Sequence, residues 1–531
     1  MQSSASEIEF NSPFASWYSV RSAKWAWRKI CGVGRFLKRH FWKITGSLAV
    51  LITAAWQYEN WHGRAELAEQ RAAWQAEFGA MKLEDFISES VPDEENFFAA
   101  PIFEQWTVAP SDPGPNLSAR QIEQRKAEAA MPHARFLQMK CPGLPSTEFT
   151  EIDKHQTMPG LETLDFTAWA KKDFPSRPAR PSGMTDAQWY VAVTPRSEVV
   201  DDLKAALARS RSQWLPTSKE RMAVSKALDD PFATPIPAVS NLFELSQGLM
   251  TRARAAARAG DGPQARELIE ITWRFVEATT EGESLVHALV GSALEGMAVE
   301  AMAEGIATQC WSAEDLKHLM NRMQLVNEER MIRQGLFREA FHTQLWPVEK
   351  IRASIKRNFA EDKRSHSGLL RAWSRGPEGW LDANLAQLLK WWSQILSPDL
   401  PGDDLVYLDL KMNAGTAALR SERAYTSPNP RQIMAAMAIP ALTNIAGSAL
   451  QNQTRRRQLL LAAAVERFQL AEHRLPKDAS ELVPKYLTEI PGDPSAPGKP
   501  LTYISGEGPE RYRLVSKNKD LTLAFPQEAL R

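Results

Sequence analysis

The pattern of apolar and polar residues begins with a short apolar stretch near the N-terminus. Fifteen residues from Ile44 to Tyr58 carry no charge. As an α-helix they span about 22 Å, less than the roughly 30 Å of a bilayer core. Aromatic residues at both ends, such as Phe41 and Trp61, lengthen the span as interfacial side chains. Residues 41–61 are therefore predicted to form a transmembrane anchor.

The charges on either side of this anchor predict its orientation. The basic segment Arg21–Lys43 contains eight Lys and Arg residues, whereas the only acidic residues before it are Glu7 and Glu9. Acidic and basic residues are mixed after residue 58. The positive-inside rule then places the N-terminus in the cytoplasm and the rest of the chain outside, in the periplasm of an inner-membrane, single-pass protein. A cleaved signal peptide and a peripheral or buried helix remain as alternatives.

The first 40 residues form a cytoplasmic basic segment with amphipathic spacing. On a helical wheel most of its basic residues gather on one side, and Trp27, Ile30 and Leu37 gather on the other. This pattern is typical of a helix that lies in an anionic headgroup layer. It is equally consistent with an ordinary basic flank that only sets the topology.

Residues 62–196 are predicted to contain a stalk helix and an irregular, Pro-rich region. The helix covers 61–82, with Leu67, Trp74 and Phe78 on its apolar side. From about residue 107 the chain is rich in Pro, Ser, Thr and Gly, which favours extended segments that wrap over the helical part. A short helix is expected within it at Asp165–Lys171.

Helical periodicity dominates residues 197–457. Helices are expected at 241–259 and 264–279, separated by a Gly260–Pro263 stop in which Asp261 or Gly262 is the N-cap. The pair resembles one tetratricopeptide-type hairpin, although no 34-residue period repeats around it. Further helices are expected at 284–307, 312–327, 328–345 and 379–396. They predict a helical bundle or an irregular α-solenoid.

Two of these helical stretches are apolar enough to raise the question of a membrane span. Residues 284–307 contain Glu295 and Glu300, which favours a buried helix of the bundle, with Gly291, Gly296 and Gly305 allowing close packing. Residues 432–454 carry no charge, but Pro440 and several amides interrupt them. Packing inside the soluble part is favoured for both, and a second span at 432–454 remains the alternative.

Composition narrows the possible partners. Lys plus Arg and Asp plus Glu are both 64, so no global field favours nucleic acid. Of the three cysteines, Cys31 is expected in the cytoplasm, and Cys141 and Cys310 outside. The latter two could pair in an oxidising compartment, but their spacing does not establish it.

The tail, residues 458–531, combines a helix, a second short helix capped by Asp478, and two strands at 501–504 and 511–516. Its motifs are His473-Arg-Leu-Pro, Leu482-Val-Pro, Tyr486-Leu, Ile490-Pro-Gly-Asp-Pro and Tyr512-Arg-Leu-Val-Ser. This order resembles the C-terminal part of the major pseudopilin of type II secretion. It also resembles bacterial single-pass membrane proteins that end in the same way.

The resemblance implies a local α+β fold for the tail, with neither pilus assembly nor a metal. No pseudopilin-type processing site precedes the apolar stretch, and some 400 residues separate that stretch from the tail. The stretch that corresponds to the pseudopilin calcium loop, Lys517–Asp520, has two cations and one carboxylate, which disfavours Ca²⁺.

Motifs of known chemistry are scarce. Glu339-Ala-Phe-His342 is a single Glu-x-x-His, whereas a di-iron site needs two. Glu314 and His318 have the spacing of an ordinary surface pair. The run Arg455–Arg457 is interpreted as a solvated helix face. The sequence therefore predicts no catalytic, cofactor-binding or metal-binding residues.

Two classes of function remain. The first is a membrane-anchored envelope protein that acts as a non-catalytic binding or scaffold module, with the membrane and an unidentified protein as partners. The second is an envelope hydrolase whose site is assembled from distant residues. A part in a secretion or pilus-like machine is a further alternative. The absence of a catalytic motif and the helical-hairpin character favour the first class.

Overall fold

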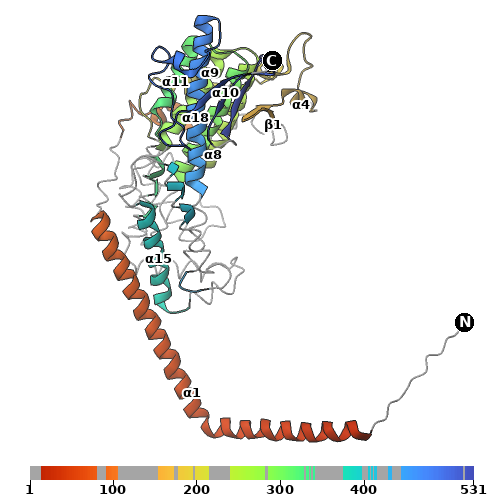
Figure 1. The fold of residues 1–531 in the computed structure, drawn as a ribbon, viewed down its shortest axis with the longest axis vertical. Coiled ribbons are helices and arrows are strands. Elements are labelled where there is room, and N and C mark those ends of the chain that lie inside the picture. The colour runs from red at the N-terminus through yellow and green to blue at the C-terminus, as the bar shows by residue number, and fades with distance from the viewer. Residues whose placement is uncertain are drawn as a thin grey trace, which may run out of the picture.

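The computed structural model is mostly helical, with a three-stranded antiparallel sheet near the C-terminus (Figure 1). The structure describes residues 13–79, 91–105, 154–172, 177–194, 198–213, 239–280, 285–327, 375–396, 429–432, 444–506, 508–517 and 521–530, with short pieces between 331 and 340 and between 405 and 414.

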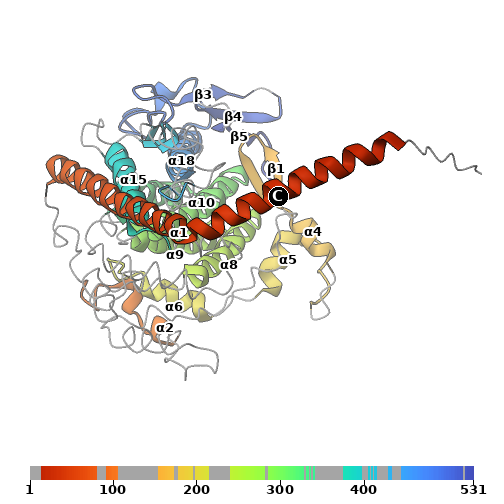
Figure 2. The same ribbon diagram turned by 90° about the horizontal axis from the view of Figure 1, so that it is seen from below.

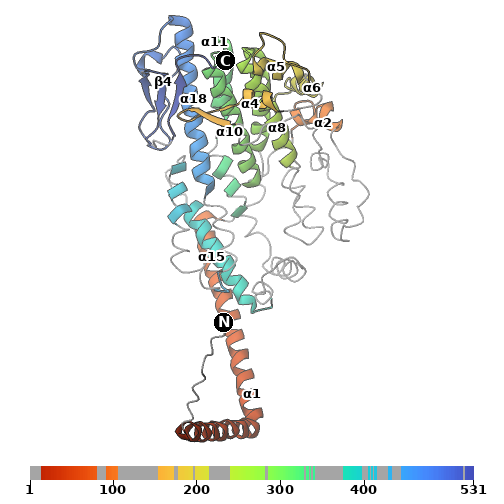
Figure 3. The same cartoon turned by 90° about the vertical axis from the view of Figure 1, so that its right-hand side faces the viewer.

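The basic segment, the predicted anchor and the stalk belong to one helix, α1 (Pro13–Phe78). It bends sharply, and its N-terminal arm runs across the direction of the rest, well away from the helical body (Figures 1 and 3). Within the described part of the chain, α1 packs on the body through its C-terminal part, against α15 (Glu378–Leu396). The amphipathic helix predicted over 61–82 is confirmed as far as Phe78, because Leu67 and Trp74 are buried there and Phe78 packs beside them.

An upper hydrophobic cluster forms around a central helix, α10 (Leu285–Ala307). Its other helices are α8 (Val239–Arg258), α9 (Gly262–Thr280), α11 (Ala313–Leu325) and α18 (Asn444–Glu472). In Figure 2, α10 lies with α8 and α9 on one side and α18 on the other, in agreement with its contacts. The predicted hairpin of α8 and α9 is confirmed. Asp261 is the N-cap of α9, because Oδ1 of Asp261 accepts a hydrogen bond from the Gln264 backbone N–H at 3.1 Å.

A lower cluster joins α1 to α15, with Trp391 and Trp392 buried at its centre. The first turns of α10 and α18 also belong to this cluster, whereas their later turns belong to the upper one. Two helices therefore run through both clusters and tie them together. Ile445 and Ala446, from the stretch considered as a second span, are buried in this lower cluster.

Glycines bring helices into close contact. At Gly63 in α1 an added Cβ would lie 2.0 Å from the backbone oxygen of Gly379 in α15, so the two backbones touch. Within the upper cluster Gly305 faces the Trp311 ring and Gly291 faces Thr279, which confirms close packing at these two positions. Gly296 is different, because its Cβ would meet only Asn452 at 3.7 Å.

We expect Gly63→Ala to weaken the attachment of α1 to α15 by about 1–3 kcal/mol, because the new methyl group overlaps backbone atoms that cannot turn aside. Gly296→Ala is the matched control, since it also lies within a helix but has room, and alanine is favoured there by about 0.5–1 kcal/mol. Denaturant unfolding of both variants measures the difference. Equal stability of the two variants would contradict the close crossing.

The region predicted to be irregular contains short elements where it is described. They are η2 (Phe97–Ala99), α2 (Pro101–Gln105), β1 (Lys154–Met158), β2 (Leu161–Leu164), α4 (Phe166–Lys171) and α5 (Asp186–Val193). The helix α6 (Glu198–Ala206) follows, at the start of the region predicted to be helical. The expected helix at 165–171 is confirmed as α4, with Asp165 as its N-cap. The fully buried Asn96 joins two distant segments, because its amide bonds to the backbone of Gln213 in both directions.

The tail contains η5 (Ala479–Leu482), β3 (Thr502–Ser505), β4 (Glu510–Val515) and β5 (Leu523–Pro526), paired in the order β3–β4–β5. The predicted hairpin is confirmed, and β5 adds a strand that was not predicted. The N–H of Ala524 in β5 donates to the Pro159 oxygen at the β1–β2 turn. The expected boundary between 457 and 458 falls inside α18, so the tail and the helical part share one helix and one core.

Candidate functional site

The most exposed apolar surface of the described chain lies on α1. Ten large apolar or aromatic side chains between residues 41 and 61 are exposed: Phe41, Trp42, Ile44, Leu48, Val50, Leu51, Ile52, Trp56, Tyr58 and Trp61. Successive residues of a helix point about 100° apart, so the exposed run Leu48–Ile52 covers its whole circumference. The apolar surface therefore surrounds the helix rather than forming one stripe.

A polar cluster marks the end of this apolar surface. The Arg431 guanidinium donates to Glu59 at 2.9 Å and to Glu66 at 2.7 Å, and its Nη2 lies 2.5 Å from Nδ1 of His62. The three α1 residues share one helix face, at spacings of three and four residues. Arg431 therefore fixes α1 to the body where the chain changes from apolar to charged.

The central helix α10 is the one helix of the described chain that is long and apolar enough to cross a membrane by length and composition. Of that stretch, 61% is buried inside the protein. It packs against α8, α9 and α18, and Glu295 and Glu304 on it are fully buried, so we interpret it as a core helix. The predicted anchor at 41–61 does not meet the same measure, because its uncharged run is short and includes Thr, Ser and Gln.

Buried ion pairs hold α10 to its neighbours. Glu304 receives hydrogen bonds from Arg254 at 2.5 Å and from Arg258 at 2.7 Å. Glu295 lies 3.3 Å from Arg456, which also donates to the Val326 carbonyl. Both buried carboxylates of α10 therefore have a cationic partner, which offsets the cost of burying their charge.

The interpretation of Arg455–Arg457 as a solvated face was wrong. Arg456 is only 5% exposed and lies in the ion pair with Glu295. Arg457 donates to the Gly492 carbonyl of the tail at 3.0 Å, and Arg455 lines a cavity. Periodicity treats charged residues as solvent-facing, whereas Arg456 and Arg457 contact partners that are far away in the sequence.

A buried network joins the tail to α18. The Glu466 carboxylate accepts hydrogen bonds from Arg511 and from the Tyr512 hydroxyl, both at 2.6 Å. Burial raises the pKa of Glu466, and the charge and hydrogen bonds of Arg511 and Tyr512 oppose that rise. Burial also takes the pKa of Tyr512 well above its ordinary value of 10.0. The network fixes β4 on the helix and has a structural role.

The Asp493 carboxylate of the tail is held by hydrogen bonds within the protein. The Asp493 carboxylate accepts hydrogen bonds from the backbone N–H groups of Ser495 and Lys517 and from the Ser516 hydroxyl. Its lone pairs are therefore used within the protein. Residues 518–520 lie outside the described part. Among the described residues no group of three or more His, Cys, Asp and Glu side chains could hold a metal ion.

The other predicted candidates are separate from one another. His318 pairs with Glu270 of α9 at 3.1 Å, and no ion pair joins it to Glu314, the partner expected from spacing. Burial raises the pKa of Glu339, whereas His342 lies outside the described residues. Cys310 is a free thiol whose pKa burial raises to about 12, and Cys141 also lies outside the described part.

We expect Glu270→Gln to lower stability in a pH-dependent way. Burial would raise the pKa of Glu270, but the Arg322 hydrogen bond and the charge of His318 outweigh it, so the pKa lies below 4.5. A lowered carboxyl pKa stabilises the fold above the unfolded-state pKa, and this contribution is lost as pH falls through the folded-state value. The difference from the parent protein is therefore about 1–2 kcal/mol at pH 7 and disappears in acid. Denaturant unfolding between pH 7 and pH 3 measures it, and a constant difference would contradict it.

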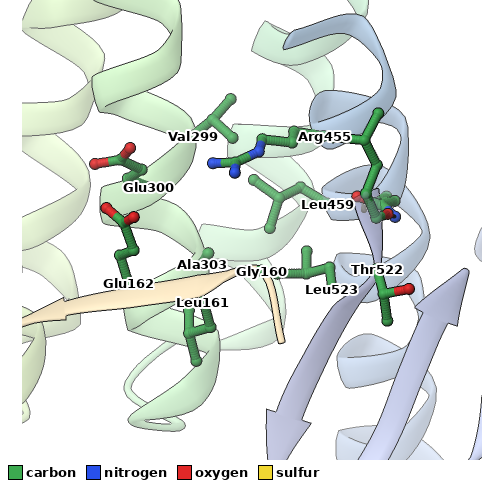
Figure 4. Close-up of a pocket in the computed structure, with 12 residues that line it drawn as sticks. Gly160, Leu161, Glu162, Val299, Glu300, Ala303, Arg455, Leu459, Thr522 and Leu523 are labelled. Carbon is green, nitrogen blue, oxygen red and sulfur yellow. Dashed lines mark hydrogen bonds between the residues drawn. The ribbon is translucent and has the colours of Figure 1, made fainter. Parts of the chain in front are cut away.

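A small cavity lies between β2, α10, α18 and the start of β5 (Figure 4). Its volume of about 20 Å³ accommodates little more than one water molecule. The polar side chains around it are Glu162, Glu300, Arg455, Gln458 and Thr522. Sequence reasoning missed this site, because its walls come from four separate segments.

Comparison with protein-family models, with curated proteins and with solved structures gives no match for this chain.

Proposed function

We propose that the protein is a single-pass, membrane-tethered binding or scaffold module whose helical body lies in the periplasm. The observation that carries the proposal is the apolar surface around α1 between residues 41 and 61. Trp42 is 84% exposed and Val50 is 68% exposed. Soluble monomers rarely leave so large a contiguous apolar surface in water. A bilayer covers a helix from all sides, which a groove on a partner protein does not.

The ends of this apolar surface also suit a membrane. Trp42 and Trp61 lie near its two limits, at the depth where aromatic side chains favour the interface. The charged cluster around Arg431 begins just where the helix would leave the lipid. Because α1 bends sharply, its basic N-terminal arm can lie flat in the headgroup layer while residues 41–61 cross the bilayer (Figure 3).

A non-catalytic role fits the chemistry of the body. The carboxyl groups whose pKa burial raises, Glu339, Asp409 and Glu466, do not line the cavity. The buried ion pairs around α10 hold helices together. The pseudopilin-like tail is packed into the same core as the helices, which suits a rigid module better than a subunit that polymerises through a free N-terminal helix.

Protease protection on spheroplasts of a bacterial expression host tests the proposal. The full chain carries one epitope at each terminus. We expect added protease to destroy the C-terminal epitope and to leave a small N-terminal fragment in the membrane. Protection of the C-terminal epitope in intact spheroplasts, with cleavage after lysis, would overturn the proposed orientation. Recovery of the full chain in the soluble fraction would overturn the tether itself.

A further inference from the structure

The three-stranded sheet of the tail has one covered edge and one open edge. The turn between β1 and β2 covers the edge at β5, because the Ala524 N–H donates to the Pro159 oxygen at 2.9 Å. An added Cβ at Gly160 would lie 2.0 Å from the Thr522 oxygen, so this contact is close. At the opposite edge, β3 pairs only with β4 within the described part of the chain, and Figure 2 shows it as the outermost strand of the sheet.

The register of β3 on β4 shows which of its backbone groups face outward. The Gly506 N–H donates to the Arg511 carbonyl at 2.9 Å, which makes residues 506 and 511 a hydrogen-bonded pair. Hydrogen-bonded and non-hydrogen-bonded pairs alternate along an antiparallel ladder. Ile504 therefore directs its N–H and C=O toward β4, whereas Tyr503 and Ser505 direct theirs away from it. No hydrogen bond among the described residues satisfies these outward groups.

The open edge lacks the features that usually keep edge strands from pairing. The strand Thr502–Ser505 contains no proline and no charged residue, and its ladder with β4 has no bulge. Ile504 is 38% exposed. Arg513, which lies opposite Ile504 on β4, pairs with Glu510 at 3.4 Å, so the charge nearest to the strand is neutralised. The edge thus offers backbone donors and acceptors in a neutral, partly apolar setting.

We infer that β3 binds an extended, uncharged segment of a partner protein, which adds a fourth strand to the sheet. Tyr503 and Ser505 each exchange N–H and C=O hydrogen bonds with the backbone of that segment. Its side chains on the face of Ile504 are apolar or β-branched, because they pack beside that residue. The inference rests on the proposed function, because it supplies a partner site for the binding module.

A second copy of the chain fits this edge less well than a flexible segment. The strand has four residues and is about 14 Å long. The Leu501 N–H before it already donates to the Pro491 oxygen at 2.9 Å, so the open edge ends there. Two such short strands bury far less than the roughly 1,200 Å² of a stable interface. An extended segment can continue past both ends of β3 and follow the surface.

Fluorescence anisotropy with the full chain in detergent tests the inference. The probe is a labelled, uncharged peptide, Ser-Thr-Val-Thr-Val-Thr-Ser. One matched peptide carries methyl groups on its central backbone nitrogens and cannot donate, and another replaces each of its Thr residues by Glu. We expect the probe to bind at least ten-fold more tightly than either matched peptide.

Substitutions in β3 separate backbone recognition from side-chain recognition. Ser505→Pro removes an outward N–H but no hydrogen bond to β4, so it should weaken binding at least ten-fold. Ser505→Ala is the matched control and should leave binding unchanged, because it keeps both backbone groups. Ile504→Lys places a charge at the edge and should also weaken binding at least ten-fold. Circular dichroism and denaturant unfolding show which variants keep their fold.

A probe that does not bind the parent chain would overturn the inference, as would a methylated peptide that binds equally well. Unchanged affinity in a folded Ser505→Pro or Ile504→Lys variant would overturn it too. Sedimentation velocity should give the same oligomeric state for the parent and Ser505→Pro, whereas a parent dimer that this variant dissociates would show that a second copy occupies the edge. Protease protection measures the tether separately. A soluble chain that binds the probe would refute the tether alone, and a tethered chain that does not bind it would refute the partner site alone.

Discussion

Glu304→Ala lowers the free energy of unfolding by about 3–5 kcal/mol, because it leaves Arg258 without its counter-charge and leaves Arg254 only the longer contact to Glu300 at 3.4 Å. Glu304 is fully buried, and the Arg254 side chain is 6% exposed. Arg254 also donates to the Glu162 carbonyl at 2.8 Å, so the pair joins α8, α10 and β2. Removal of one carboxylate therefore weakens three elements at once.

Denaturant unfolding followed by tryptophan fluorescence measures this loss, since Trp273 and Trp311 lie in the same cluster. Glu267→Ala is the matched control. Glu267 belongs to α9 and pairs with Lys204, whose side chain is 47% exposed, so its loss should cost less than about 1 kcal/mol. A loss below about 1 kcal/mol for Glu304→Ala would show that the two arginines reach water or other partners in the variant.

Helices with a clear apolar face and turn residues at their ends were predictable from sequence. The hairpin of α8 and α9 follows from the Gly260–Pro263 stop, and the Asp261 cap forms as expected. The stalk face of Leu67 and Trp74 follows from spacing alone. These features depend on neighbours three or four residues away, which the sequence displays directly.

Polar residues that face inward were not predictable in the same way. Gln458 is 1% exposed because its amide donates to the Leu514 and Leu521 carbonyls of the tail. Arg456 is buried because Glu295 lies opposite on another helix. Both partners are distant in sequence, so the sequence pattern alone predicted a domain boundary between residues 457 and 458, where α18 continues.

The polar cluster around Arg431 and the cavity also depend on residues that are distant in sequence. Glu59, His62 and Glu66 lie on one face of α1 at visible spacings, whereas their partner Arg431 is more than 360 residues away. The cavity draws its charges from β2, α10 and α18, three elements with no shared motif. Only the folded arrangement brings these groups together, which explains why the sequence predicted no site residues.

Two arginines in the exposed apolar part of α1, Leu48→Arg with Leu51→Arg, should move the protein from the membrane to the soluble fraction. Leu48 is 54% exposed and Leu51 is 66% exposed, so neither substitution removes packing from the body. An arginine near the centre of a membrane helix costs about 3 kcal/mol, and two cost about 6 kcal/mol, or about four orders of magnitude in partition. The prediction follows only if lipid covers this surface.

Carbonate extraction of membranes, with immunodetection of the C-terminal epitope, measures the partition. Leu325→Arg is the matched control, because Leu325 is 68% exposed on α11 of the body and should stay with the membrane fraction when replaced. Loss of the double variant from the pellet, with the control retained, is the expected result. If the double variant stays in the pellet, the anchor does not lie at 41–61. The exposed apolar surface of α1 would then be buried against another molecule, such as a second copy of the chain. Crosslinking of the Leu48→Cys variant would detect that dimer.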